Sequence, residues 1–300
     1  MVLPDPTRLI NAQQKLAEEE ERQLKLIQKM MVERLQPDEP PKELPPLKKW
    51  PKPKGLHILV IGDSHAEPKV PNHRYEWLGR MVRDRRPDVV VDIGDWFDMP
   101  SLNRFDRPGS HRMEGQRYYL DIWAGVDAQR RFQIACGDYQ PRLVRCLGNH
   151  ESRISRAVEN DPQRQAVFGL HHLESERYGW EEHPFLEAVN IGGVAFSHYF
   201  TSGVMGRPIG GENPAAMLLK KQFHSAVQGH SHVLDYCDRK DSFSKKIIAM
   251  HAGCYFHHEM DWAGPANQIY SRGILELHNV HNGEFDHQWT SIEKIREMYG

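Results

Sequence analysis

The chain has 300 residues, of which 39 are Lys or Arg and 41 are Asp or Glu, so its formal charge is only −2. This balance excludes a protein that coats nucleic acid through bulk positive charge, although it leaves room for a local basic groove. The length allows two ordinary domains, or one large α/β domain with an appendage, and a core that needs no disulfides. The unusual count is histidine, with 18 residues, because imidazole is a common metal ligand and a near-neutral acid–base group.

Three features of the sequence bear on the cellular compartment. No apolar run approaches the roughly 20 residues of a membrane span. The first ten residues include Pro4, Asp5 and Pro6, which is unlike a secretory signal. The four cysteines show neither CxxC spacing nor the pattern of a disulfide framework. We therefore expect a cytoplasmic protein that does not associate with a membrane.

The first 53 residues differ in composition from the rest and form a predicted extension. Residues 7–36 are rich in good helix formers and contain neither Gly nor Pro, which predicts a helix. Seven prolines between residues 37 and 53 then predict a stiff linker. The apolar repeat of the helix is broken, which argues against a long coiled coil. The helix either docks on its own domain or mediates self-association or binding to a protein partner, and the composition leaves both open.

Residues 54–300 are predicted to form one domain in which short apolar runs alternate with amphipathic stretches. This alternation predicts an α/β architecture with parallel strands at the start, and the late run of strands predicts a mixed or antiparallel second half. The expected strands span residues 56–61, 88–93, 143–147, 194–197, 226–228, 246–250, 274–278 and 285–289. The expected helices span residues 75–85, 114–135, 152–168 and 214–222.

Polar residues gather just after five of these strands, where α/β folds place their sites. The five segments are Gly62-Asp63-Ser64-His65, Gly94-Asp95-Trp96-Phe97-Asp98, Gly148-Asn149-His150-Glu151, Ser197-His198 and Gly229-His230-Ser231-His232. Each segment alone is a weak signal. Together they offer carboxylates, imidazoles and one amide but no thiolate, a set of ligands suited to manganese, iron or zinc. Residues two apart, such as His230 and His232, leave a strand on the same side, and Asp95 is well placed to bridge two ions.

In this order, the segments GDSH, GDWFD, GNHE, a single His and GHSH resemble the calcineurin-like metallophosphoesterases, over most of residues 56–232. The resemblance implies a four-layer α/β/β/α sandwich of two mixed β-sheets, with a dinuclear metal site at the strand ends. It implies that one divalent ion is held by Asp63, His65, Asp95 and His232, and the other by Asp95, Asn149, His198 and His230. Mn²⁺ is the expected metal, with Fe or Zn as alternatives. The resemblance also implies that His150 is the catalytic histidine and that Asp98 orients it.

A dinuclear site of this kind predicts a phosphoesterase in which a metal-bridging hydroxide attacks phosphorus and His150 assists the leaving group. The protein Ser/Thr phosphatases of this superfamily carry an Arg directly after the second segment, where this chain has Met99-Pro100. That difference, together with the paired His230 and His232, favours a phosphodiesterase or nuclease that hydrolyses DNA or nucleotide-type diesters. A phosphomonoesterase, either a protein Ser/Thr phosphatase or a nucleotide phosphatase, is the alternative. A catalytically idle scaffold that acts through its N-terminal helix is the third reading.

Candidate substrate contacts lie on both sides of the third segment. Arg104 and Arg107 precede it in a stretch that also contains aromatic residues, and basic residues with aromatic rings suit single-stranded nucleic acid. Arg153 follows Asn149 by four residues and is a further candidate phosphate contact. The alternative is that these arginines are solvated residues around a helix packed on the core. We expect single- or double-stranded DNA as a candidate partner.

Overall fold

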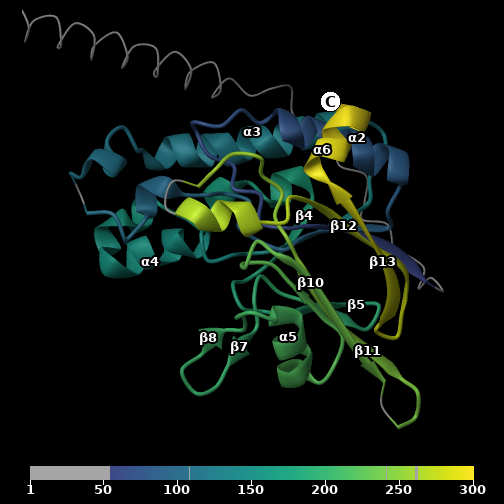
Figure 1. Ribbon diagram of the computed structural model, residues 1–300. Coiled ribbons are helices and arrows are strands. Elements are labelled where there is room, and N and C mark those ends of the chain that lie inside the picture. The colour runs from purple at the N-terminus through teal and green to yellow at the C-terminus, as the bar shows by residue number, and fades with distance from the viewer. Residues whose placement is uncertain (1–54, 108, 241, 261–262) are drawn as a thin grey trace, which may run out of the picture. The chain divides into compact units, whose positions relative to one another are not determined.

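The computed structural model describes residues 55–300, apart from residues 108, 241 and 261–262 (Figure 1). The predicted helix over residues 7–36, the proline-rich linker and the proposed partner surface on that helix lie outside the described residues. The boundary between residues 53 and 54 stays a prediction.

The larger of two main sheets has six strands in the order β13-β12-β1-β2-β3-β4. β1 to β4 are parallel, as expected for the first half of the chain, and β12 joins β1 antiparallel. β13 pairs antiparallel with β12 at the other edge. The strands are β1 (Leu56–Ile61), β2 (Val89–Asp92), β3 (Arg142–Cys146), β4 (Trp180–His183), β12 (Gly273–His281) and β13 (Glu284–Ser291).

The second sheet has five strands in the order β10-β11-β9-β6-β5 and is also mixed. β9 runs parallel to both of its neighbours, whereas each edge strand pairs antiparallel. The strands are β5 (Val189–Ile191), β6 (Val194–Phe196), β9 (Ala226–Gln228), β10 (Leu234–Lys240) and β11 (Lys246–Ala252), and β7 (Thr201–Ser202) with β8 (Arg207–Pro208) forms a separate short ribbon. The expectation of a mixed α/β chain is confirmed.

Side chains that alternate along β1 divide the core into two parts. Leu59 and Ile61 belong to the cluster that packs the first sheet against helices. Ile58 and Val60 belong to a second cluster, which includes Phe196 and other residues of the second sheet. All four β1 side chains are fully buried, which stabilises each by about 1.5–3 kcal/mol relative to exposure. The two sheets therefore pack against each other through one face of each.

Helices cover the outer faces of both sheets (Figure 1). α2 and α3 lie together on the first sheet with α6 beside α2, and α5 packs on β10 and β11 of the second sheet. The α-helices are α2 (His73–Arg85), α3 (Tyr118–Cys136), α4 (Ser152–Asn160), α5 (Pro214–Gln222) and α6 (Ile292–Tyr299).

Two predicted helices have different limits in the structure. The helix expected over residues 152–168 ends at Asn160, because Pro162 follows and disfavours helical backbone at Asp161, where φ is −146° and ψ is 90°. The helix expected from residue 114 begins at Tyr118, after Gly115 has turned the chain with a φ of +72°. The strands β4, β5 and β10 and the final helix α6 were not predicted. The three strands are sheet edges, and polar edge strands lack the apolar alternation that marks a central strand.

Candidate metal centre

The five polar segments meet where the C-terminal ends of strands from both sheets come together. Asp63 follows β1, Asp95 follows β2 and Asn149 follows β3 in the first sheet, whereas His198 and His230 follow β6 and β9 in the second. Backbone hydrogen bonds connect the segments. The amide of His65 donates to the carbonyl of Asp95 at 2.9 Å, and the amide of Gly229 donates to the carbonyl of His198 at 2.9 Å. The two sheets thus supply one polar cluster.

Asp63, His65 and His232 form the first group that could hold a metal ion. Nε2 of His232 lies 3.0 Å from Oδ2 of Asp63 and 3.2 Å from Nε2 of His65. One ligand atom from each residue lies within 4.8 Å of the others, and all three residues are buried. Nitrogen and oxygen donors in this arrangement suit a divalent transition metal.

Asp95, His198 and His230 form the second group with the same spacing of ligand atoms. Nε2 of His198 lies 3.3 Å from Oδ2 of Asp95 and 2.9 Å from Oδ1 of Asn149. A third group, which shares residues with the other two, contains His65, Asp95 and His150. His65 and Asp95 each belong to two of these groups, and the bridging role of Asp95 stays a prediction.

The backbone at this cluster is strained at four predicted ligands. His65, Asp95, His230 and His232 have φ values of +44°, +56°, +66° and +59°, in the left-handed region that side chains with a Cβ rarely adopt. Such conformations cost of order 1–3 kcal/mol each and persist where the surroundings fix them, often at functional sites. The neighbouring Gly148 is needed for close approach, because a Cβ there would collide with the carboxylate of Asp95.

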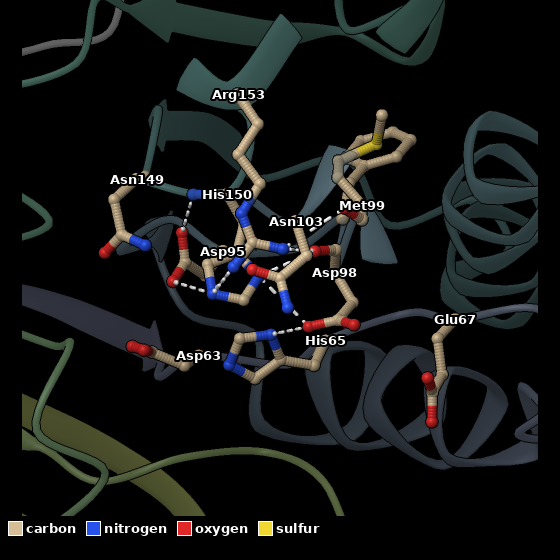
Figure 2. Close-up of polar contacts among 12 residues, drawn as sticks. Asp63, His65, Glu67, Asp95, Asp98, Met99, Asn103, Asn149, His150 and Arg153 are labelled. Carbon is tan, nitrogen blue, oxygen red and sulfur yellow. Dashed lines mark hydrogen bonds and ion pairs between the residues drawn. The ribbon is translucent and has the colours of Figure 1, made fainter. Parts of the chain in front are cut away.

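Asp98 and Arg153 surround His150 in the same cluster (Figure 2). Nδ1 of His150 lies 3.0 Å from Oδ1 of Asp98 and 2.6 Å from its carbonyl oxygen, while Nδ1 of His65 lies 2.8 Å from the same Oδ1. The guanidinium of Arg153 lies 2.9 Å from Nε2 of His150 and donates to the carbonyls of Asp98 and Met99. The structure thus places Asp98 where the sequence predicts an orienting carboxylate.

Burial and neighbouring charges shift the pKa values in opposite directions across the cluster. Burial, and then the charge of Asp63, raise the pKa of Asp95 well above its usual value. Burial alone would raise the pKa of Asp98, but hydrogen bonds from His150 and His65 hold it well below its usual range. Burial and the charge of Arg153 lower the pKa of His150 to about 3. The imidazole is therefore neutral, and the raised pKa of Asp95 shows that its ionisation is disfavoured in this cluster, a cost that a bound cation would offset.

Glu151 is a residue of the site whose role the sequence did not indicate. Its fully buried carboxylate accepts hydrogen bonds from the backbone amides of Asp95, Phe97 and Gly148, at 3.1, 2.8 and 2.8 Å. It therefore holds the second and third segments together. Burial, and then the charge of Asp95, raise the pKa of Glu151 to about 8. The feature of the sequence that could have indicated this role is the position of Glu151 in the GNHE segment, directly after Asn149 and His150.

Aromatic rings from the chain after β11 complete the wall around the first group. The ring of Phe256 lies 5.4 Å from that of His65 and 5.2 Å from that of His232, and the ring of Tyr270 lies 4.7 Å from that of His232. Sequence spacing did not assign Tyr270, because the chain reaches the site through a loop. The bridge between Cys254 and Asp63 places that loop there.

A pocket of about 780 Å³ adjoins the second group. Asn149 and His230 form part of its lining, and so do Arg153 and the exposed Arg104. Arg107 is exposed and is not among the residues that line this pocket. Of the three arginines predicted to bind substrate, the structure thus brings two to the site.

None of the helices in the described part of the chain combines the length and apolar character needed to cross a membrane. No protein-family model matches the chain, and no curated protein matches it. By structure, 49 solved chains match it. One solved chain is 10% identical, and the match covers 79% of this chain and 100% of the other with a TM-score of 0.35. A likeness of that strength assigns neither a family nor an activity.

Proposed function

We propose that the chain is a dinuclear metal-dependent phosphoesterase of the calcineurin-like kind, with its sheets and helices arranged as a four-layer α/β/β/α sandwich. The observation that carries the proposal is the pair of buried groups Asp63–His65–His232 and Asp95–His198–His230, which lie side by side at the strand ends. The core clusters support the layering, because each sheet packs on the other with one face and on helices with its outer face.

The donor set fits two divalent ions, for which Mn²⁺ is the first candidate and Fe or Zn the alternatives. The first ion would be held by Asp63, His65, Asp95 and His232, and the second by Asp95, Asn149, His198 and His230. When bound, such ions supply positive charge for the phosphoryl oxygens and activate water near neutral pH. Without them, three buried aspartates would share a site in which the nearby Arg153 donates to backbone carbonyls and to His150.

The role we assign to His150 is to stabilise or protonate the leaving oxygen at Nε2. Its Nδ1 faces the carboxylate and the carbonyl of Asp98, so this side of the ring carries the hydrogen and fixes the tautomer. Nε2 is then the free acceptor, and in this structure it contacts Arg153. A substrate phosphate beside Arg153 would compete for that guanidinium and release Nε2, which would then take up a proton from water and pass it to the leaving oxygen.

The pocket supports a substrate that extends beyond one phosphate. Four arginines line it, namely Arg104, Arg153, Arg156 and Arg164, together with the rings of Phe105 and Tyr199. Phe105 is exposed and lies 5.1 Å from the Arg104 guanidinium. Guanidinium groups and exposed rings bind phosphates and bases of single strands, respectively. We therefore propose a phosphodiester of DNA or of nucleotide type as the substrate.

A phosphomonoesterase is the second candidate, and the position of Arg153 favours it. A monoester carries one more negative charge than a diester and gains more from a cation in the site. The Arg153 guanidinium reaches Nε2 of His150 and so provides a cation near the proposed reaction centre. A scaffold without catalysis stays the third reading, and it requires no metal in the cluster.

The deciding experiment is a paired assay of Mn²⁺-loaded full-length protein, with Asp95→Asn as the blank. One arm contains an aryl phosphodiester and labelled single- and double-stranded DNA, and the other contains an aryl monoester and a phosphopeptide. Turnover of diesters that disappears in the blank is the expected result. Faster turnover of monoesters would replace the diesterase with the phosphatase. Absence of turnover together with absence of bound metal would leave the scaffold.

A further inference from the structure

A second set of metal-ligand side chains lies at the other end of β1 from the candidate metal centre. His57 is near the start of β1, and Glu276 and His278 are on its antiparallel neighbour β12. One ligand atom from each of the three lies within 4.8 Å of the others. His57 precedes Asp63 by six residues, so about 20 Å of strand separates the two places.

The three side chains share the face of the sheet that is opposite to the second sheet. Their neighbours Ile58, Leu275 and Leu277 point into the core between the sheets, and side chains alternate along a strand. Nε2 of His57 lies 3.0 Å from Oε2 of Glu276. The rings of His57 and His278 stack with their centroids 4.4 Å apart and an interplanar angle of 27°.

Two buried polar atoms in this set have no hydrogen-bond partner among the residues that the structure describes. They are Oε1 of Glu276 and Nε2 of His278. Glu276 is fully buried, and a buried carboxylate oxygen without a partner is costly. An ion pair between His57 and Glu276 explains only one of the two carboxylate oxygens. A bound cation, which would accept an electron pair from Oε1 of Glu276 and another from Nε2 of His278, would give both atoms a partner.

We propose that His57, Glu276 and His278 bind a divalent cation with the preferences of Zn²⁺. Two imidazoles and one carboxylate are a zinc ligand set, and water takes the fourth position. Imidazole donors disfavour Ca²⁺ and Mg²⁺, which prefer oxygen ligands. The cation ties the start of β1 to β12 and so stabilises the antiparallel seam of the first sheet.

The test is the zinc content of full-length protein after equilibrium dialysis against Zn²⁺, compared between the natural chain and His278→Phe. Phenylalanine keeps an aromatic ring to stack on His57 but offers no ligand atom. The matched control is His281→Phe, which changes an exposed histidine at the end of the same strand. Loss of about one equivalent of zinc is expected in His278→Phe and not in His281→Phe.

A second variant keeps the test decisive if His278→Phe lowers the stability of the metal-free protein. Glu276→Gln retains an oxygen that can accept from His57 but removes the negative charge, so it should lose the same equivalent of zinc. Thermal denaturation should agree, since Zn²⁺ should raise the melting temperature of His281→Phe more than that of Glu276→Gln. Equal zinc content in all four proteins would overturn the proposal, whatever the outcome at the strand-end cluster.

Discussion

Two buried polar regions of this molecule lie close together in sequence but differ in how their charges are balanced. On β2 and β3, Asp92 and Arg145 form a fully buried ion pair at 2.6 Å. Arg145 also donates to Gln129 and Ser175 and lies under the rings of Trp96 and Trp180. In this region the carboxylate has a guanidinium partner, although burial still raises the pKa of Asp92, and the pair belongs to the structure.

The strand-end cluster, a few residues further along the same strands, balances its carboxylates differently. Asp63, Asp95 and Asp98 face imidazoles rather than a guanidinium partner of the Arg145 kind. Against the effect of burial, the imidazoles hold the pKa of Asp63 and of Asp98 below the usual range, whereas burial and the charge of Asp63 raise the pKa of Asp95. Buried carboxylates without a compensating cation are the electrostatic condition that a metal ion relieves. The comparison therefore contrasts a buried carboxylate that has a guanidinium partner with a buried carboxylate, Asp95, whose charge a bound cation would offset.

The largest expected effect is on catalysis and separates chemistry from metal binding. His150→Asn removes the proposed proton donor at Nε2 but leaves both groups of metal ligands intact. We expect kcat to fall by about 10²- to 10⁴-fold and the metal content to stay unchanged. Steady-state kinetics with metal analysis checks this, and His171→Asn, at an exposed histidine, is the control. Loss of metal in His150→Asn would mean that His150 is itself a ligand.

The next effect is on stability and concerns the balanced region. Arg145→Met leaves Asp92 buried without its cation, which should lower the free energy of unfolding by about 3–5 kcal/mol without changing the bound metal. The control is Arg142→Met on the same strand, because Arg142 and Glu181 form a half-exposed pair worth roughly 1 kcal/mol or less. Urea denaturation measures both. Similar losses of unfolding free energy in Arg145→Met and Arg142→Met would contradict the distinction between the fully buried pair and the half-exposed pair.

A smaller effect is expected in the pocket. Arg104→Gln should raise KM for a DNA strand by about 10-fold and weaken its salt dependence, since the guanidinium lines the pocket. KM for an aryl diester too short to reach it should not change. Arg107→Gln is the matched control, because Arg107 lies in the same loop but outside the pocket lining. Equal effects of the two substitutions would remove the pocket from substrate binding.

A pH-dependent effect is expected from a third kind of buried charge, Asp121 at the start of α3. Burial raises its pKa to about 7, and its Oδ2 accepts from the amide of Ser101 at 2.9 Å. Because the folded pKa exceeds the unfolded one, the folded state binds the extra proton, and stability falls as the pH rises from about 4 to about 7. Asp121→Asn should flatten this dependence by about 4 kcal/mol over that range, since one pKa unit corresponds to about 1.4 kcal/mol.

Urea denaturation at several pH values between 5 and 8 checks the Asp121 prediction. The control is Asp138→Asn, which changes an exposed carboxylate. An unchanged slope in Asp121→Asn would show that this carboxyl group titrates normally in the folded protein.

Much of the candidate site followed from the sequence because its residues come in short segments tied to strands. Asp63, Asn149 and His230 each follow an apolar run, and such a run predicts both the strand and the end at which the side chain emerges. Residues that reach the site from loops, such as Tyr270, carried no comparable signal. Their position depends on how the chain after β11 returns to Asp63, which is a tertiary contact.

Two of the strands that escaped prediction, β4 and β10, share a physical cause. β10 has the sequence LDYCDRK with no fully buried residue, and β4 has the sequence WEEH with one. An edge strand is held by backbone hydrogen bonds to one neighbour, and its side chains are not required to alternate. The central strand β1, in contrast, was predicted with its observed limits, because both of its faces are buried.

The central claim is that the strand-end cluster holds two metal ions. The most direct measurement is an anomalous difference map, recorded at the manganese absorption edge, from crystals of the full-length chain grown with Mn²⁺. We predict two peaks about 3.5–4 Å apart, one among Asp63, His65 and His232 and the other among Asp95, His198 and His230. A map without peaks in this cluster, or with a single peak, would contradict the account.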